Sequence, residues 1–484
     1  MIWSSQSEGP DSADLPRTAV FFGFYLVLVL TMGIWGRVFS RRIAITNLEL
    51  SLRRFNQAMV SARMMVLIWF SIGLFYLHWG HTVLAMLGPV THLKLETPGA
   101  VLSALPVLLA WAGLFWAQFP ADRSLREQSL LLQLESDLPV QMPPNFWSAF
   151  FANLRLHVLF VVVPVLLVLI LRDVITVVLT KTGQMPTPGS GVNELLLFGS
   201  TFVVFAVAPE LLRFILHTHS LPPSELRERL EHLCRANKLR YRDILLWRTN
   251  HTLSNAAVMG ILPMFRYVLL SDLLVATMTD EEIEAVFAHE AGHIKNRHML
   301  WYLLITVTLV VSLAGPISWL EEILHAHWPK VFDPQFAAIF IESIATVLLI
   351  AVFGLVSRRF ERQADVYAAR WMQKSHMTAI ASLPGLAPEL ARYAQVDAVG
   401  QYGASVFNSA LRRAATVNNV PMHARNFIHG SIASRMQFLQ HLSRSPERTY
   451  TFEVFIGLLK LLIFACLVMG TGVAYLMRDR VFAG

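Results

Sequence analysis

Long uninterrupted apolar runs constrain this chain more than any other feature of its sequence. Eight runs of about 17–25 residues are each long enough to cross a bilayer as a helix. Only 15% of the 484 residues are charged, against about 25% in soluble globular proteins. The sequence therefore predicts an α-helical multi-span membrane protein and excludes a disordered chain, a coiled coil and an ordinary cytosolic enzyme. The runs are Ala19–Trp35, Met64–Leu84, Gly99–Phe119, His157–Thr180, Leu195–Leu212, Met299–Leu320, Ala337–Val356 and Val454–Met477.

Arginine and lysine residues gather in alternate segments between these runs, and the net charge is +7. Basic segments follow the first, third, fifth and seventh runs, whereas the intervening segments carry few positive charges. The positive-inside rule then places the long polar segments in the cytoplasm and the N-terminus outside. Because membrane topology accounts for the basic charge, we expect the lipid bilayer, and no nucleic acid, as a partner.

Two polar segments are long enough to fold together into a small cytoplasmic α+β domain. The first is predicted to contain strands at about 244–247, 255–260 and 267–271, before a helix that begins at the Thr279–Glu282 capping box. The predicted division is 1–214 with five spans, 215–298, 299–356 with two spans, 357–453, and 454–484 with the eighth span and a tail.

A short motif on the predicted helix points to metal chemistry. His289 and His293 are four residues apart, so their imidazoles lie on the same face of a helix and can reach one zinc ion. Glu290 is rotated by about 100° from the first histidine and can act as a base on a nearby water without being a ligand. This H-E-x-x-H pattern predicts a zinc metallopeptidase.

A catalytic zinc site needs a third protein ligand and one open position. Glu361 and Asp365 follow the seventh apolar run and share one helical face. Glu361 is predicted to ligate zinc, and Asp365 to accept the free N–H of a ligand histidine. The alternative is a solvated helix start in which Glu361 pairs with Arg358 or Arg362. The H-E-x-x-H motif favours ligation, since zinc otherwise lacks its third protein ligand.

In combination these motifs resemble integral-membrane gluzincin metalloproteases, namely the type 1 CAAX prenyl protease family and the bacterial HtpX-type proteases. The resemblance implies a hydrolase with one zinc ion per chain. Five predicted spans precede the zinc motif, as in the CAAX prenyl proteases, whereas HtpX-type proteins have two there. The resemblance covers about Leu239–Leu439. The motifs that carry it are His289–His293, His298, Ser357–Asp365 and the edge-strand region with Asn255–Ala256 and Arg266–Ser271.

Two further predictions concern substrate contacts. His429 to Arg435 resembles the family's later His-Pro-Pro-x-x-x-Arg stretch, although Gly430 and Ser431 replace both prolines. The resemblance implies a catalytic role for His429 as an oxyanion helper, and a surface histidine is the alternative. An extended substrate is expected to pair with an edge strand, which favours broad specificity because backbone is recognised before side chains. The predicted edge residues are Asn255, Ala256, Ala257 and Val258.

The sequence thus predicts a zinc endopeptidase that cleaves membrane-associated or unfolded membrane proteins at the cytoplasmic interface. One alternative is a CAAX-type prenyl-protein protease. Another is a membrane zinc sensor or transporter without catalysis. Glu290 favours an enzyme, because a site that only binds zinc needs no base at that position.

Overall fold

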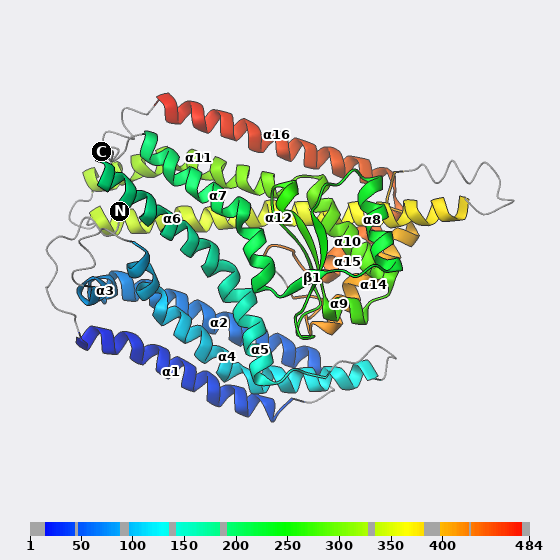
Figure 1. The fold of residues 1–484 in the computed structure, drawn as a ribbon, viewed down its shortest axis with the longest axis horizontal. Coiled ribbons are helices and arrows are strands. Elements are labelled where there is room, and N and C mark those ends of the chain that lie inside the picture. The colour runs from blue at the N-terminus through cyan, green and yellow to red at the C-terminus, as the bar shows by residue number, and fades with distance from the viewer. Residues whose placement is uncertain are drawn as a thin grey trace.

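The computed structural model describes residues 15–43, 47–87, 96–134, 142–183, 191–327, 334–381, 397–424 and 427–476. Long helices run side by side, and a small α+β domain lies at one end of the helices drawn in green and yellow (Figure 1). The apolar character of the long helices therefore places most of the chain in a membrane, with one compact polar domain beside it.

The first helical group forms the N-terminal part of the membrane region. It consists of α1 (Leu15–Ser40), α2 (Leu48–Phe75), α3 (Trp79–Leu87) and α4 (Thr97–Leu134). Phe21 is fully buried at its centre, against Tyr25, Val66 and Trp79. The second predicted span is wrong as a single helix, because the chain breaks after Phe75, and His78 adopts a left-handed conformation with φ of 52°.

A second group of helices follows in the chain and leads to the α+β domain. It consists of α5 (Phe146–Asn153), a π-helical stretch at Leu154–Leu159, α6 (Phe160–Thr182) and α7 (Gly191–Ile215). Asp173 in α6 accepts the backbone N–H groups of Glu96 and Thr97 at 2.9 and 3.0 Å. A carboxylate there satisfies free N–H donors at the start of α4 and ties the two groups together.

Three long helices complete the membrane region: α11 (His298–His327), α12 (Pro334–Ala381) and α16 (Glu447–Leu476). Figure 1 shows them side by side, with α12 extending into the α+β domain. Phe360 of α12 is fully buried between Ile305 of α11 and Ile456 of α16. A single continuous helix, α12, thus connects the membrane region to the polar domain.

Seven of the eight predicted spans fall on helices as far as the described residues reach, and the second is interrupted at residues 76–78; Met477 lies outside the described residues. Within the described part of the chain, six helices are long and apolar enough to span a membrane. A seventh candidate joins α10 (Asp280–Lys295) and α11 across a 48° bend. The multi-span fold class is confirmed, and the number of spans is six or seven among these residues.

The α+β domain contains a four-stranded sheet in the order β1-β2-β4-β3. The strands are β1 (Thr218–Ser220), β2 (Asp243–Trp247), β3 (Ala256–Met259) and β4 (Tyr267–Ser271). The pair β2–β4 is parallel, and β1–β2 and β3–β4 are antiparallel. The three predicted strands are confirmed and β1 was not predicted. Because β3 pairs on one side only, it forms an edge of the sheet.

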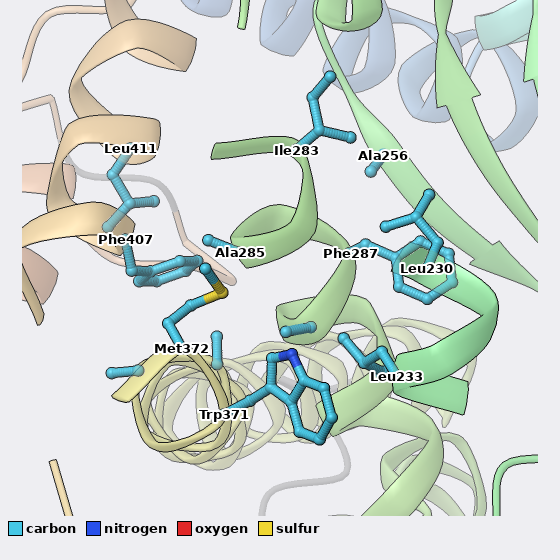
Figure 2. Close-up of a cluster of buried hydrophobic side chains, with 14 of the residues drawn as sticks. Leu230, Leu233, Ala256, Ile283, Ala285, Phe287, Trp371, Met372, Phe407 and Leu411 are labelled. Carbon is cyan, nitrogen blue, oxygen red and sulfur yellow. The ribbon is translucent and has the colours of Figure 1, made fainter. Parts of the chain in front are cut away.

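The helices around the sheet share one apolar core (Figure 2). They are α8 (Glu225–Ala236), α9 (Asp272–Thr277), α10, α14 (Gln401–Val417) and α15 (Ile432–Arg444). Leu230, Phe287, Trp371 and Phe407 come from α8, α10, α12 and α14 and meet in this core. The predicted capping box is confirmed, since Thr279 and Glu282 satisfy each other's backbone N–H groups at the start of α10.

Candidate metal centre

Three side chains converge where α10 crosses α12. The Nε2 atoms of His289 and His293 lie 3.3 Å apart. Glu361 places Oε1 3.5 Å from His293 Nε2 and Oε2 3.6 Å from His289 Nε2. Donor atoms about 2.0–2.1 Å from a tetrahedral zinc lie roughly 3.4 Å from one another. The donor set therefore fits one zinc ion, and its binding stays a prediction.

A glycine permits this close crossing of the two helices. Gly292 lies on α10 between the histidines, where a Cβ would be 3.1 Å from Ala364 Cα and 3.2 Å from the Tyr367 side chain. A Cβ at this position would require its neighbours on α12 to shift by a few tenths of an ångström, because these contacts are tighter than nine in ten observed for a Cβ. The glycine within the H-E-x-x-H motif thus lets Glu361 approach the histidine pair.

His289 is oriented through its second ring nitrogen. Its Nδ1 lies 3.0 Å from Asp365 Oδ1, which leaves Nε2 facing Glu361. Asp365 is fully buried and receives two hydrogen bonds from Arg435, at 2.9 and 2.5 Å. A buried carboxylate paired in this way stays ionised and can hold the imidazole in one orientation. The sequence offered Arg435 only as the last residue of a family-like stretch and indicated no contact for it.

These contacts change the protonation of His289. Burial lowers the pKa of this imidazole, but hydrogen bonds to Asp365 and Glu361 outweigh burial and raise the pKa to about 9. In the metal-free chain His289 therefore carries a proton at neutral pH. A zinc ion must displace this proton, since only the neutral ring is a ligand.

Glu290 lies beside the donor set without belonging to it. Its Oε2 accepts the backbone N–H of Val258 at 3.1 Å. Burial raises the pKa of Glu290 to about 7, and the nearby charge of Glu361 acts in the same direction. A carboxylate with a pKa near neutrality can take up and release a proton at physiological pH, as a general base requires.

A cavity of about 750 Å³ opens over these residues. His289, His293, Glu290 and Glu361 line it. Apolar side chains from α14, among them Phe407 and Leu411, line it as well. A cavity of this size and mixed character is typical of sites that bind a ligand or substrate segment.

The predicted edge residues 255–258 line the same cavity. Of these, Asn255 precedes β3 and its carbonyl accepts the N–H of Ser271 at 3.0 Å. Antiparallel pairing alternates, so Ala257 also faces β4, whereas Ala256 and Val258 turn their backbone groups away from it. Two positions of the predicted edge therefore present backbone groups on the free side of the sheet.

His429 lies at the rim of the cavity, with half of its side chain exposed and Nδ1 2.8 Å from Glu361 Oε2. It thus contacts a predicted ligand, and its role as an oxyanion helper stays a prediction. The next residue, Gly430, has a φ of 75°. Proline cannot adopt this conformation, so the backbone at position 430 excludes the first proline of the family's His-Pro-Pro pattern.

Comparison with known proteins identifies the domain that holds this centre. Residues 220–443 match the model of peptidase family M48. Residues 220–443, called the M48 segment below, are similar to a peptidase domain of this family. The M48 segment contains His289, Glu290, His293, Glu361 and Asp365, and it occupies just under half of the chain. The predicted resemblance to membrane metalloproteases of this type is confirmed.

Two curated plant proteins are similar to part of this chain. The "CAAX prenyl protease 1 homolog" of Arabidopsis thaliana is 28% identical over 185 residues, covering 36% of this chain and 43% of that protein. The protein of the same name from Oryza sativa subsp. japonica is 27% identical over 183 residues, with the same coverage. The chain spans less than half the length of these relatives. The crystal structure of S. mikatae Ste24p matches 88% of this chain and 99% of its own, with a TM-score of 0.46 and 15% identity.

Proposed function

We propose that this chain is a zinc-dependent endopeptidase that cleaves membrane-associated or unfolded membrane proteins at the cytoplasmic interface. One observation carries the proposal: the donor set, Glu290 and the free edge of β3 line one cavity. Metal ligands alone would suit a sensor or transporter. A base and a strand-pairing edge beside them suit the hydrolysis of an extended peptide.

His289, His293 and Glu361 would hold one zinc ion. When bound, zinc acts as a Lewis acid that polarises a carbonyl group and lowers the pKa of water. Glu290 accepts a proton from the attacking water and delivers it to the leaving amine, so the peptide bond is broken and one water is consumed. Asp365, held by Arg435, keeps the ring of His289 in the orientation that exposes Nε2.

The substrate would pair with β3 as an added strand. Ala256 and Val258 turn their backbone groups to the free side of the sheet, and backbone hydrogen bonds of this kind recognise any extended segment. Side-chain selectivity then comes from the apolar wall that Phe407 and Leu411 contribute. We therefore expect broad specificity for extended segments with apolar residues.

The site would lie at the ends of the membrane helices. The helix α10 ends at Lys295 and α11 begins at His298, while Glu361 lies on α12, which also forms a candidate span. The alternation of positive charge favours the cytoplasmic side. A site so close to the bilayer meets membrane-bound segments at a higher effective concentration than soluble ones.

A second candidate is proteolysis of prenylated C-terminal segments. The two plant relatives, each named a CAAX prenyl protease 1 homolog, favour it. It ranks second because no prenyl-reading motif is visible in the sequence.

The test uses the purified full chain in proteoliposomes beside Glu290→Gln. Zinc content and casein cleavage establish the activity. One cleavable segment is then offered as a free peptide, as a prenylated peptide and tethered to a membrane span. We expect the tethered segment to be cleaved fastest. Equal rates in all three settings would contradict the membrane preference, and a prenylated peptide cleaved fastest would favour the second candidate.

A further inference from the structure

We infer that Lys460 and Glu453 of α16 are positioning residues for the metal centre. Through Gln363 and His298 they determine which ring nitrogen of His293 carries the proton, and so leave Nε2 of that ring free for zinc. This inference rests on the proposed function, in which His293 binds zinc. Both residues lie beyond the M48 segment, which ends at residue 443.

The amide of Gln363 lies between two charges from α16. Its Nε2 donates to Glu453 Oε2 at 2.7 Å, and its Oε1 accepts from Lys460 Nζ at 3.4 Å. An ammonium group can only donate and a carboxylate can only accept. Turning the amide over would set its NH₂ against Lys460 and its carbonyl against Glu453, so the two charges hold it in one orientation.

His298 passes this orientation on to the metal centre. It is fully buried and stacks on Phe360, with ring centroids 4.7 Å apart and planes at 3°. Its Nε2 lies 3.0 Å from Gln363 Oε1, and its Nδ1 lies 3.0 Å from His293 Nδ1. Because the amide oxygen only accepts, His298 carries its proton on Nε2 and offers a lone pair at Nδ1.

The ring nitrogen of His293 that carries the proton is then determined as well. Its Nδ1 must donate to the lone pair of His298, so its Nε2 is unprotonated and faces His289 and Glu361. If the amide of Gln363 were turned over, each donor and acceptor along this path would reverse. The proton of His293 would then sit on Nε2, where zinc should bind.

Both charged groups of α16 are held by other contacts besides Gln363. Lys460 Nζ lies 3.5 Å from the carbonyl of Asn296 and over the rings of Trp301 and Phe360, at 5.7 and 5.5 Å. Glu453 Oε1 accepts from Arg370 at 3.2 Å. Their positions therefore do not depend on the amide that they orient.

The decisive experiment measures zinc affinity of the full chain by competition with a chromophoric chelator, and the visible spectrum of the cobalt(II) form. Lys460→Met and Gln363→Met should each weaken zinc binding about tenfold or more, the range found when groups that orient metal ligands are removed. Gln363→Glu alone places two carboxylates side by side and should also weaken binding.

The double variant Gln363→Glu with Glu453→Gln should restore affinity to within about threefold of wild type. A carboxylate at 363 accepts from His298 and Lys460, and an amide at 453 donates to it. Every hydrogen bond on the path to His293 then has the same donor and acceptor direction as in wild type. Rescue of this kind would not follow if α16 merely supported the fold.

Arg359→Met is the matched control. Like Lys460, Arg359 is a cation at the contact between α12 and α16. It lies on α12 over the ring of Phe455 of α16 at 5.6 Å and is outside this path. It should leave zinc affinity and the cobalt spectrum unchanged. Unchanged affinity in Lys460→Met and Gln363→Met, or a double variant as weak as its single parent, would overturn the inference. A wild-type chain that binds no zinc would instead refute the proposed function first.

Discussion

Val258 donates its backbone N–H to Glu290 across 3.1 Å, so the free edge of the sheet directly contacts the proposed base. An added substrate strand needs the same N–H group. Pairing at Val258 would therefore release Glu290 from this contact and let its carboxylate turn toward a water. The contact links substrate binding to the availability of the base.

Glu290→Gln should keep zinc and lose turnover. The residue is not a donor in the metal set, and a general base contributes about 10²–10⁴ in rate. Metal analysis and casein cleavage on the same preparation measure both quantities. Cleavage within tenfold of wild type would remove Glu290 from the reaction.

His289→Ala and Glu361→Ala should each lose both metal and activity, because three donors are needed to hold zinc with one open position. Metal content after dialysis distinguishes these variants from Glu290→Gln. Full zinc occupancy in Glu361→Ala would exclude Glu361 as a ligand. Glu361 would then act only through its contacts with the three histidines, of which that with His429 is the shortest at 2.8 Å.

Glu290 should also make the metal-free fold less stable at alkaline pH. Its pKa is about 7 in the folded chain, against 4.5 for the free group, so the folded state disfavours the charged carboxylate. The stability it contributes is complete below pH 4.5 and is lost as the pH rises through 7. Metal-free Glu290→Gln should therefore unfold at a higher temperature than wild type at pH 8. The corresponding gain in the free energy of unfolding is at most about 3 kcal/mol. The two should melt alike near pH 4, and a gain at pH 4 as large as at pH 8 would contradict this assignment.

Arg435→Met should destabilise the chain by about 3–5 kcal/mol, since it breaks the buried ion pair with Asp365 by removing one partner. Adding Asp365→Asn to this variant should recover part of the loss, because the carboxylate that lost its guanidinium partner is then neutral. Denaturant unfolding of the metal-free variants gives the two values. A double variant less stable than Arg435→Met alone would show that the pair does not act as an ion pair.

Cysteine labelling can test the orientation in the membrane. Arg235→Cys, near Lys238 on α8, should react only from the cytoplasmic side, and Lys181→Cys, at the end of α6, only from the outside. Both side chains are exposed, and the native Cys234 and Cys466 would first be replaced by serine. External labelling at position 235 would reverse the orientation and place the M48 segment outside.

The sequence predicts those features whose geometry is set by local spacing. The pairs His289–His293 and Glu361–Asp365 are each four residues apart on one helix, so their shared faces follow from helix geometry alone. The strands at β2, β3 and β4 carry apolar residues and were predicted. The strand β1 has only three residues, two of them hydroxyl side chains, and leaves no periodic signal.

Contacts between distant helices could not be predicted in this way. The approach of Gln363 to Lys460 joins positions 97 residues apart, and that of Asp365 to Arg435 joins positions 70 apart. No local pattern records which side chains face each other when two helices pack. The break at His78 was also missed, because hydropathy does not respond to one residue in a left-handed conformation.

The helix α12 is 48 residues long, about 70 Å at 1.5 Å per residue, and carries Glu361 on the same rod that crosses the bilayer. The histidine donors belong to a different helix, α10, which is packed in the M48 segment. When the acyl chains around the protein become shorter or longer, a spanning helix adapts by tilting. Tilting α12 would load its contact with α10 at Gly292, between a carboxylate and two imidazoles, so the thickness of the surrounding membrane would act on the metal centre as a mechanical input.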